Sequence, residues 1–249
     1  SGVDEMHKEH LYDPHDVNAI FQGAASDDLA EVKFNADANY EQASGEDFVN
    51  VLRCHTTSLS RTMSAVDEKF GVDEAVASLV RRAGDIPQDG RGPVNSTIPV
   101  TDVPSHHGPD VQAVMPELDI KTLAVKVPVT YGHVHMVNAE LEENVSEEEV
   151  LEAFKNQPRV NLIEADAGFD STGKVHEQMR DLGRKRADMQ EAGVWKETVT
   201  VDDGTVYWIH MVHQESIVVP DNVDAIRAMF DMEEKEESIE KTNEAMDIK

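Results

Sequence analysis

Cysteine, aromatic residues and positive charge are all scarce in this sequence. Cys54 is the single cysteine among 249 residues, which excludes a disulfide within the chain. Aromatic residues make up 5% of the sequence, so we expect a core built from Val, Ile, Leu, Ala and Met. The 22 Lys and Arg residues form no basic stripe that could contact phosphates, which disfavours binding to nucleic acid.

Long apolar runs are also missing, and we find no signal peptide, so we expect no membrane span and a cytoplasmic protein. The 50 Asp and Glu residues give a formal net charge of −28 and are spread along the whole chain. Such a charge repels itself at ordinary ionic strength and is screened by salt, which indicates a halophilic surface. The chain starts at Ser1, without Met, and its first residues read as the middle of a domain, so we expect its N-terminus to be incomplete.

Strands and helices alternate in the first part of the chain. Thr56 and Thr57 offer N-cap side chains for a helix that continues to a break at Gly71. A long stretch rich in Pro, Gly, Ser and His follows, of the kind that often carries function. The predicted elements are a strand over 18–23, a strand over 48–54, a helix to Phe70, a short helix over 73–83 and irregular chain over 84–116.

Strands dominate the next part, and helices become frequent toward the end. Asp202-Asp203-Gly204 is a strong signal for a hairpin turn, and Ser146 begins a capping box. The order of elements predicts an α+β domain with a mostly antiparallel sheet and helices on one side. The predicted elements are strands over 123–129, 134–141, 159–164, 196–201 and 205–213, helices over 146–156 and 174–191, and a long helix from Asp221 with Val223, Ile226 and Phe230 on one face.

Cys54 lies where a predicted strand ends and a predicted helix begins. Backbone N–H groups and the helix dipole at such a position favour the thiolate, the form that attacks an electrophile. A buried structural cysteine is the alternative for any lone Cys. The Thr56-Thr57 pair directly after it favours a nucleophile.

Histidines form three clusters, at 106–107, at 133 and 135, and at 213. His133 and His135 would point to the same face of a strand, which suits either a general base or a metal site. With a cysteine already placed for attack, a Cys–His pair explains more residues than a metal does. Arg81 and Arg82 close the predicted short helix, where they either satisfy its dipole or clamp a phosphate.

Together these motifs resemble the archaeal-type (type II) glyceraldehyde-3-phosphate dehydrogenases. The resemblance covers nearly the whole chain. It rests on motifs that occur in the family's order: Asn39-Tyr40, Cys54-His-Thr-Thr-Ser-Leu59 with Arg61, Leu79-Val-Arg-Arg-Ala83, Ser105-His-His-Gly-Pro-Asp110, Val127-Pro-Val-Thr130 with Gly132-His-Val-His135, Arg180-Asp-Leu-Gly-Arg184, Val212-His-Gln-Glu-Ser-Ile217 and Pro220-Asp-Asn-Val-Asp-Ala-Ile-Arg-Ala228.

The resemblance implies a Rossmann nucleotide-binding domain, a catalytic α+β domain and assembly as a homotetramer. Residues 1–53 would be the remnant of the nucleotide-binding domain, 54–216 the catalytic domain, and 217–249 a C-terminal helix that packs back on the first. The glycine-rich fingerprint for a cofactor pyrophosphate has no counterpart in this sequence.

The implied reaction is the phosphorylating oxidation of glyceraldehyde 3-phosphate with NAD or NADP and inorganic phosphate, without a metal. Cys54 would be the nucleophile and His133 the base, with His135 as the second choice. The family's substrate contacts fall on Arg53, Cys54, His55, His106, His107 and Gly108, and its cofactor contacts on Ala24, Arg82 and Gln214.

Three positions depart from the family's pattern, which has Ser before the cysteine, Asn after it and Gly three residues later. This chain has Arg53, His55 and Ser58 there; Arg53 and His55 would lower the thiol pKa further or signal an altered substrate preference. The alternatives are a related semialdehyde dehydrogenase, a metal-binding module built on His106, His107, His133 and His135, and a non-catalytic subunit.

Overall fold

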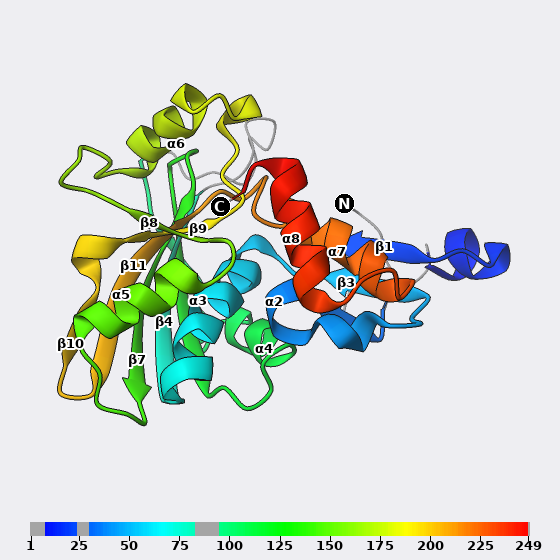
Figure 1. Ribbon diagram of the computed structural model, residues 1–249, viewed down its shortest axis with the longest axis horizontal. Coiled ribbons are helices and arrows are strands. Elements are labelled where there is room, and N and C mark those ends of the chain that lie inside the picture. Colours follow the sequence, from blue (N-terminus) through cyan, green and yellow to red (C-terminus); the bar gives the residue numbers. More distant parts are fainter. Residues whose placement is uncertain (1–7, 24–29, 83–94, 249) are drawn as a thin grey trace.

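The computed structural model describes residues 8–23, 30–82 and 95–248, which form two sheets (Figure 1). The smaller sheet is parallel, in the order β1-β3-β2. Its elements are β1 (Ala19–Gln22), β2 (Val32–Phe34) and β3 (Phe48–Val51), with the short helix α2 (Ala36–Asn39) after β2.

The larger sheet has eight strands in the order β5-β6-β4-β7-β11-β9-β8, with β10 paired to β11. Its pairs are antiparallel except for β4 with β6 and β8 with β9. The predicted α+β sheet, joined to a small Rossmann-type parallel sheet, is confirmed. The strands are β4 (Val72–Arg82), β5 (Ile98–Pro99), β6 (Ile120–Val127), β7 (His133–Leu141), β8 (Val160–Ile163), β9 (Ala192–Trp195), β10 (Thr200–Asp202) and β11 (Thr205–Val212).

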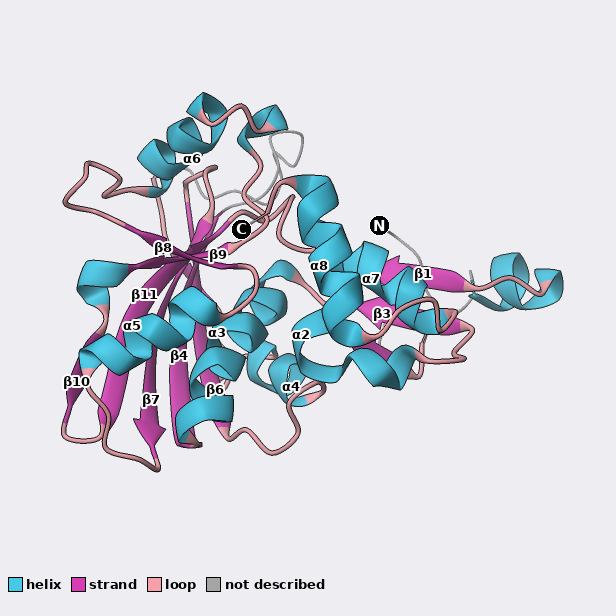
Figure 2. Cartoon of the chain, viewed as in Figure 1, coloured by secondary structure: helices cyan, strands magenta, loops and turns pink. Residues whose placement is uncertain are grey.

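Helices α3 and α5 cover one face of the larger sheet, and α6 lies apart from them (Figure 2). Leu59 and Met63 of α3 pack on Leu79 of β4 in an aliphatic core, as the composition predicts. Met179 of α6 packs with Met211 in a separate cluster. The helices are α3 (Cys54–Phe70), α4 (His107–Gln112), α5 (Glu147–Asn156), α6 (Thr172–Asp181), α7 (Val219–Met229) and α8 (Lys235–Met246). In the described part of the chain, no helix is both long and apolar enough to cross a bilayer.

The prediction of a short helix over 73–83 is wrong, because residues 73–82 belong to β4 in the centre of the sheet, and residue 83 lies outside the described residues. Ala75, Ala77 and Leu79 alternate toward the core, which is the periodicity of a strand. Alanine favours helices, and the acidic pair at its start imitates a first helical turn. Pairing with β6 and β7 overrides these local preferences.

Two predicted helices have different ends. The helix over 174–191 stops at Asp181, because Gly183 takes a left-handed conformation (φ +83°) that ends it. The long helix from Asp221 is two helices, α7 and α8, separated by Asp231 at φ +48°. Val223, Ile226 and Phe230 share one face as expected, but it is the outer one, since Ile226 is 48% and Phe230 55% exposed.

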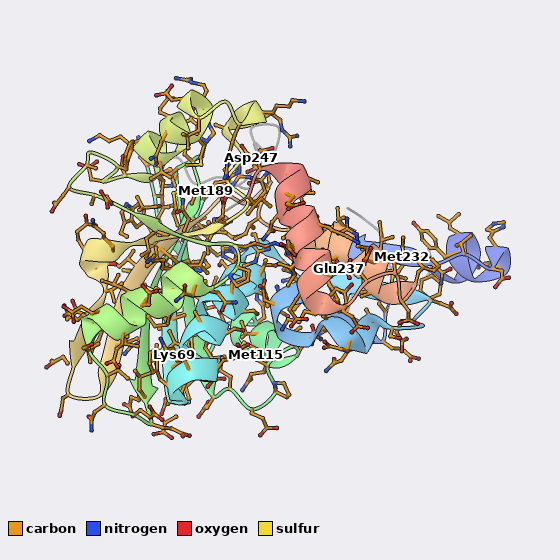
Figure 3. All side chains as sticks on the ribbon, in the orientation of Figure 1. Lys69, Met115, Met189, Met232, Glu237 and Asp247 are labelled. Atoms are coloured by element: carbon orange, nitrogen blue, oxygen red, sulfur yellow. The ribbon has the colours of Figure 1, made fainter. Side chains whose placement is uncertain are left out.

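Helices α7 and α8 pack on the small parallel sheet and join it to the larger one. Ala225 and Met229 of α7 and Ile239 of α8 share a buried cluster with Phe34 and Val51. At its far end, α8 reaches the segment that follows α6, where Figure 3 labels Met189 and Asp247. Arg184 closes this contact, because its Nη2 donates to the Asp247 carbonyl at 3.1 Å while its guanidinium pairs with Glu191.

A buried arginine lies where these parts meet. Arg61, on α3, is 0% exposed, and its guanidinium pairs with Asp37 at 3.1 Å and with Asp221 at 2.6 Å. It also donates to the carbonyls of Gln190 at 2.7 Å and Ile217 at 3.1 Å. One side chain thus binds the helix after β2, the loop before β9 and the start of α7.

Candidate active site

The turn between β3 and α3 places Cys54 at the first residue of a 17-residue helix. Arg53 is the N-cap and has an extended backbone (φ −72°, ψ 159°), and its side chain makes no capping bond. The prediction that Thr56 and Thr57 cap the helix is therefore wrong. Both lie inside the first turn, and their buried hydroxyls have no hydrogen-bond partner among the described residues.

His133 faces the sulfur from the first residue of β7. Its Nε2 lies 3.5 Å from Cys54 Sγ, and the backbone N–H of Arg82 donates to its Nδ1 at 2.9 Å. Because Nδ1 accepts a hydrogen bond, a neutral ring carries its proton on Nε2, directed at the sulfur. His135 shares this face of β7 as predicted, but it binds His55 instead of the cysteine.

The Cys54 thiol is less acidic than its helical position suggests. Burial raises its pKa from 9.0 to about 11 and outweighs the lowering by the backbone N–H of His55 and by Arg81 and Arg82. The helix start therefore favours the thiolate as expected, through the backbone N–H of His55, but burial outweighs this effect and the thiol pKa is raised. Desolvation wins because the sulfur lies inside the protein, where a charge loses its hydration.

Alkylation by iodoacetamide should report this raised pKa. Only the thiolate reacts, so the rate should rise about tenfold per pH unit and level off near the thiol pKa, which is about 11. The measurement is the second-order rate constant for Cys54 against pH, with an unstructured cysteine peptide as the control. If the rate for Cys54 levelled off at a lower pH than the rate for the peptide, the result would contradict the argument that burial raises the thiol pKa.

The predicted substrate residues gather beside Cys54. The His55 ring lies 4.7 Å from that of His107, whose ring is 4.0 Å from that of His106. Both ring nitrogens of His107 are buried and have no partner among the described residues, which leaves them available to a ligand. Arg53 lies 3.7 Å from Asp110 at the same site.

Gly108 is required by packing. A Cβ there would come within 2.9 Å of the Ile120 carbonyl oxygen. The Gly108 N–H donates to the Thr122 hydroxyl at 2.9 Å, so this N–H already has a hydrogen-bond partner within the protein. The small residue lets α4 approach β6 closely.

Two of the three predicted cofactor residues lie together next to His133. Arg82 Nε donates to Gln214 Oε1 at 3.0 Å, its Nη1 donates to the Thr130 carbonyl at 3.1 Å, and its Nη2 pairs with Glu215. The third, Ala24, falls outside the described residues.

The four-histidine metal cluster takes a different form in the structure. His106 groups with His107 and Asp110, and His133 groups with Cys54 and His55. His135 belongs to neither triplet. Among the described residues, the four histidines of that alternative therefore do not form one ligand group.

Sequence reasoning missed Trp208 and His210 as neighbours of the site, and it named Ser58 only as a departure from the family's pattern. Ser58 Oγ lies 3.2 Å from His135 Nδ1, and His210 Nε2 lies 3.0 Å from the same atom. The alternation of Val206, Trp208 and His210 along β11 could have shown that His210 faces the core.

The chain is similar in sequence to a family of known proteins. The model of the glyceraldehyde 3-phosphate dehydrogenase C-terminal domain matches residues 53–179. A glyceraldehyde-3-phosphate dehydrogenase of Methanopyrus kandleri is 46% identical over 99% of this chain and 71% of its own length. The proteins of that name from Thermococcus sibiricus (48% identical, 99% and 73%) and Haloarcula marismortui (45%, 96% and 68%) are similarly close. With the Cys54–His133 pair at its centre, the chain belongs to the glyceraldehyde-3-phosphate dehydrogenase family.

Proposed function

We propose that this chain carries out the phosphorylating oxidation of glyceraldehyde 3-phosphate to 1,3-bisphosphoglycerate through a thioester on Cys54. The observation that carries the proposal is the 3.5 Å contact between Cys54 Sγ and His133 Nε2 at the start of a helix. Nucleophile and proton-handling group are in contact there, as covalent catalysis requires.

In the first step the sulfur bonds to the aldehyde carbon, and the thiol proton ends on the carbonyl oxygen as a hydroxyl group. A bound NAD or NADP, which Arg82 and Gln214 would hold, would supply the hydride acceptor for this carbon. The hydroxyl proton departs at the same time, so the carbon becomes the carbonyl of a thioester. Phosphate then attacks that carbonyl, the C–S bond breaks, and the sulfur regains its proton.

His133 begins this sequence as a hydrogen-bond donor. Its Nε2–H stabilises negative charge on the Cys54 sulfur and on the adjacent oxygen. To accept the hydroxyl proton, Nε2 must present a lone pair, which requires the proton on Nδ1 and loss of the bond from the Arg82 N–H. We therefore expect the ring to move between the two roles.

Arg53, His55, His106 and His107 would hold the phosphorylated substrate, since the unpartnered nitrogens of buried His107 can bind its oxygens. A guanidinium and an amide, Arg82 and Gln214, lie together next to His133. Their hydrogen-bonding groups fit a cofactor that carries an amide and phosphates, so we propose that they contact NAD or NADP.

Acylation of the protein tests the proposal without the oxidation step. On incubation with 1,3-bisphosphoglycerate, mass spectrometry should show one 3-phosphoglyceroyl group on Cys54, and added phosphate should remove it. Cys54→Ser should acquire no phosphate-labile group. A wild-type protein that is never acylated would overturn the proposal and leave a metal-binding or non-catalytic subunit.

A related semialdehyde dehydrogenase is the second candidate, because it would use the same thioester chemistry. Arg53 and His55, which replace the family's usual residues, are the observations that favour a different acyl group. Acylation by β-aspartyl phosphate in preference to 1,3-bisphosphoglycerate would support this alternative.

We also propose the division of the chain at residues 53/54 and 216/217, a cytoplasmic homotetramer, and a surface adapted to salt. The packing of α7 and α8 on the small sheet supports the division.

The net charge of −28 supports the adaptation to salt. Ultracentrifugation in concentrated KCl tests the assembly, and a monomer would contradict the homotetramer.

A further inference from the structure

Four buried side chains form a hydrogen-bonded row from the core of the larger sheet to the residue next to Cys54. Trp208 Nε1 lies 3.2 Å from His210 Nδ1, and His210 Nε2 lies 3.0 Å from His135 Nδ1. His135 Nε2 in turn lies 2.8 Å from His55 Nδ1. None of the four is more than 3% exposed.

The direction of this row follows from its first member. An indole nitrogen only donates, so Trp208 fixes His210 Nδ1 as an acceptor and puts the ring proton on Nε2. The His210 Nε2–H then donates to His135 Nδ1, which at 3.0 Å is nearer than Ser58 Oγ at 3.4 Å. A neutral His135 whose Nδ1 accepts carries its proton on Nε2 and donates to His55 Nδ1. All three rings are neutral and carry their protons on Nε2.

A second proton on any of these rings would place two N–H groups against each other. Burial also lowers the pKa of His210 to about 3 and that of His55 and His135 well below 6.5. Arg81 is the charged side chain that opposes protonation of both His55 and His135. The row therefore stays in one protonation state.

The row ends on a ring that supports the catalytic pair. The centroid of the His55 ring lies 4.1 Å from that of His133, with 34° between their planes. Ser58 fixes the backbone at this end, because its hydroxyl donates to the His55 carbonyl at 3.0 Å. The His133 ring packs against the His55 ring while His133 Nε2 faces the Cys54 sulfur. The orientation of His55 therefore constrains the orientation of His133.

We propose that His55 is a positioning residue for His133, and that Trp208, His210 and His135 fix its orientation and tautomer from the core. This inference rests on the proposed function only in taking Cys54 and His133 as the reacting pair. The family's usual Asn at position 55 could accept the bond from His135, but it offers no ring for His133 to lie against.

The tautomers can be observed directly. In a ¹⁵N-labelled protein, long-range ¹H–¹⁵N correlations should show His55, His135 and His210 as Nε2–H tautomers, unchanged between about pH 5 and about pH 9. An Nδ1–H tautomer at any of the three, or a titration near the ordinary histidine pKa of about 6.5, would overturn the proposed row.

Two tryptophan variants separate positioning from stability. Trp208→Phe removes the donor that sets the direction, whereas Trp195→Phe removes an indole N–H that donates to the Phe169 carbonyl at 2.7 Å, outside the row. With p-nitrophenyl acetate, the Cys54 sulfur displaces p-nitrophenolate and forms an acetyl thioester. Trp208→Phe should slow this step about tenfold at unchanged half-saturation and mix the His210 tautomers, while Trp195→Phe changes the rate less than about twofold.

Equal losses in the two variants would mean that Trp208 is merely structural and would overturn the proposal. His55→Asn should slow acetylation by a similar factor, and an unchanged rate would also overturn it. If 1,3-bisphosphoglycerate does not acylate wild-type Cys54, the proposed function fails. The histidine tautomers then decide by themselves whether the hydrogen-bonded row exists. Mixed tautomers in a protein that is acylated normally would refute the row and leave the function intact.

Discussion

Replacing Arg61 by methionine should lower the free energy of unfolding by about 3–5 kcal/mol. The substitution removes the guanidinium that Asp37 and Asp221 bind, leaving only the longer-range attraction of Arg159 for these acids. It also removes donors from the carbonyls of Gln190 and Ile217. Burial already raises the pKa of Asp221 despite the nearby arginine, so an unpaired carboxylate there is costly. Urea unfolding followed by circular dichroism measures the loss.

A matched variant tests whether unpaired charge is the cause. Adding Asp37→Asn and Asp221→Asn to Arg61→Met should recover part of the loss, since neutral amides need no counter-ion. KCl should stabilise the wild type by screening surface repulsion, but it should leave the deficit of Arg61→Met unchanged, because salt screens buried pairs weakly. A deficit that disappears in KCl would contradict a buried origin, and a wild type that KCl does not stabilise would contradict the salt-adapted surface.

Replacing His133 by asparagine should slow acylation of Cys54 by 1,3-bisphosphoglycerate about 10²–10⁴-fold. Asparagine can still accept the bond from the Arg82 N–H, but it does not reproduce the Nε2–H that faces the sulfur. Rapid quenching followed by mass spectrometry gives the rate constant. The second-choice base, His135, contacts His55 instead, so His133 is the variant that tests the catalytic pair.

His176→Asn is the control, because this histidine is half-buried and stacks on Tyr131, with centroids 4.7 Å apart. It should be acylated at the wild-type rate. If the His133 and His176 variants behaved alike, the 3.5 Å contact with Cys54 would have no role in the chemistry.

The sequence indicated the candidate pair better than its surroundings. The boundary between a strand and a helix favoured Cys54 as a nucleophile, but the His-x-His run left His133 and His135 open. The resemblance to the family made His133 the first choice, and its Nε2 lies 3.5 Å from Cys54 Sγ. Local sequence could not show that residues 72–82 form a central strand, because their alanines favour a helix and only pairing with β6 and β7 decides.

The thiol pKa shows a second limit of prediction. The helix dipole can be inferred from residue order, and it favours the thiolate. Desolvation depends on what covers the sulfur, which only the folded chain shows, and it raises the pKa to about 11. The row that ends at His55 was missed for the same reason, since its members come from two strands and a helix that are distant in sequence.

The position of Arg61 has a consequence for recombination among relatives. Its partners lie at residues 37, 190, 217 and 221, on both sides of any crossover placed near residue 53. A chimera that inherits an acid at 37 without the arginine at 61, or the reverse, places an uncompensated charge in the interior. The two halves can therefore be exchanged as independent modules only when these positions are inherited together, which links their evolution.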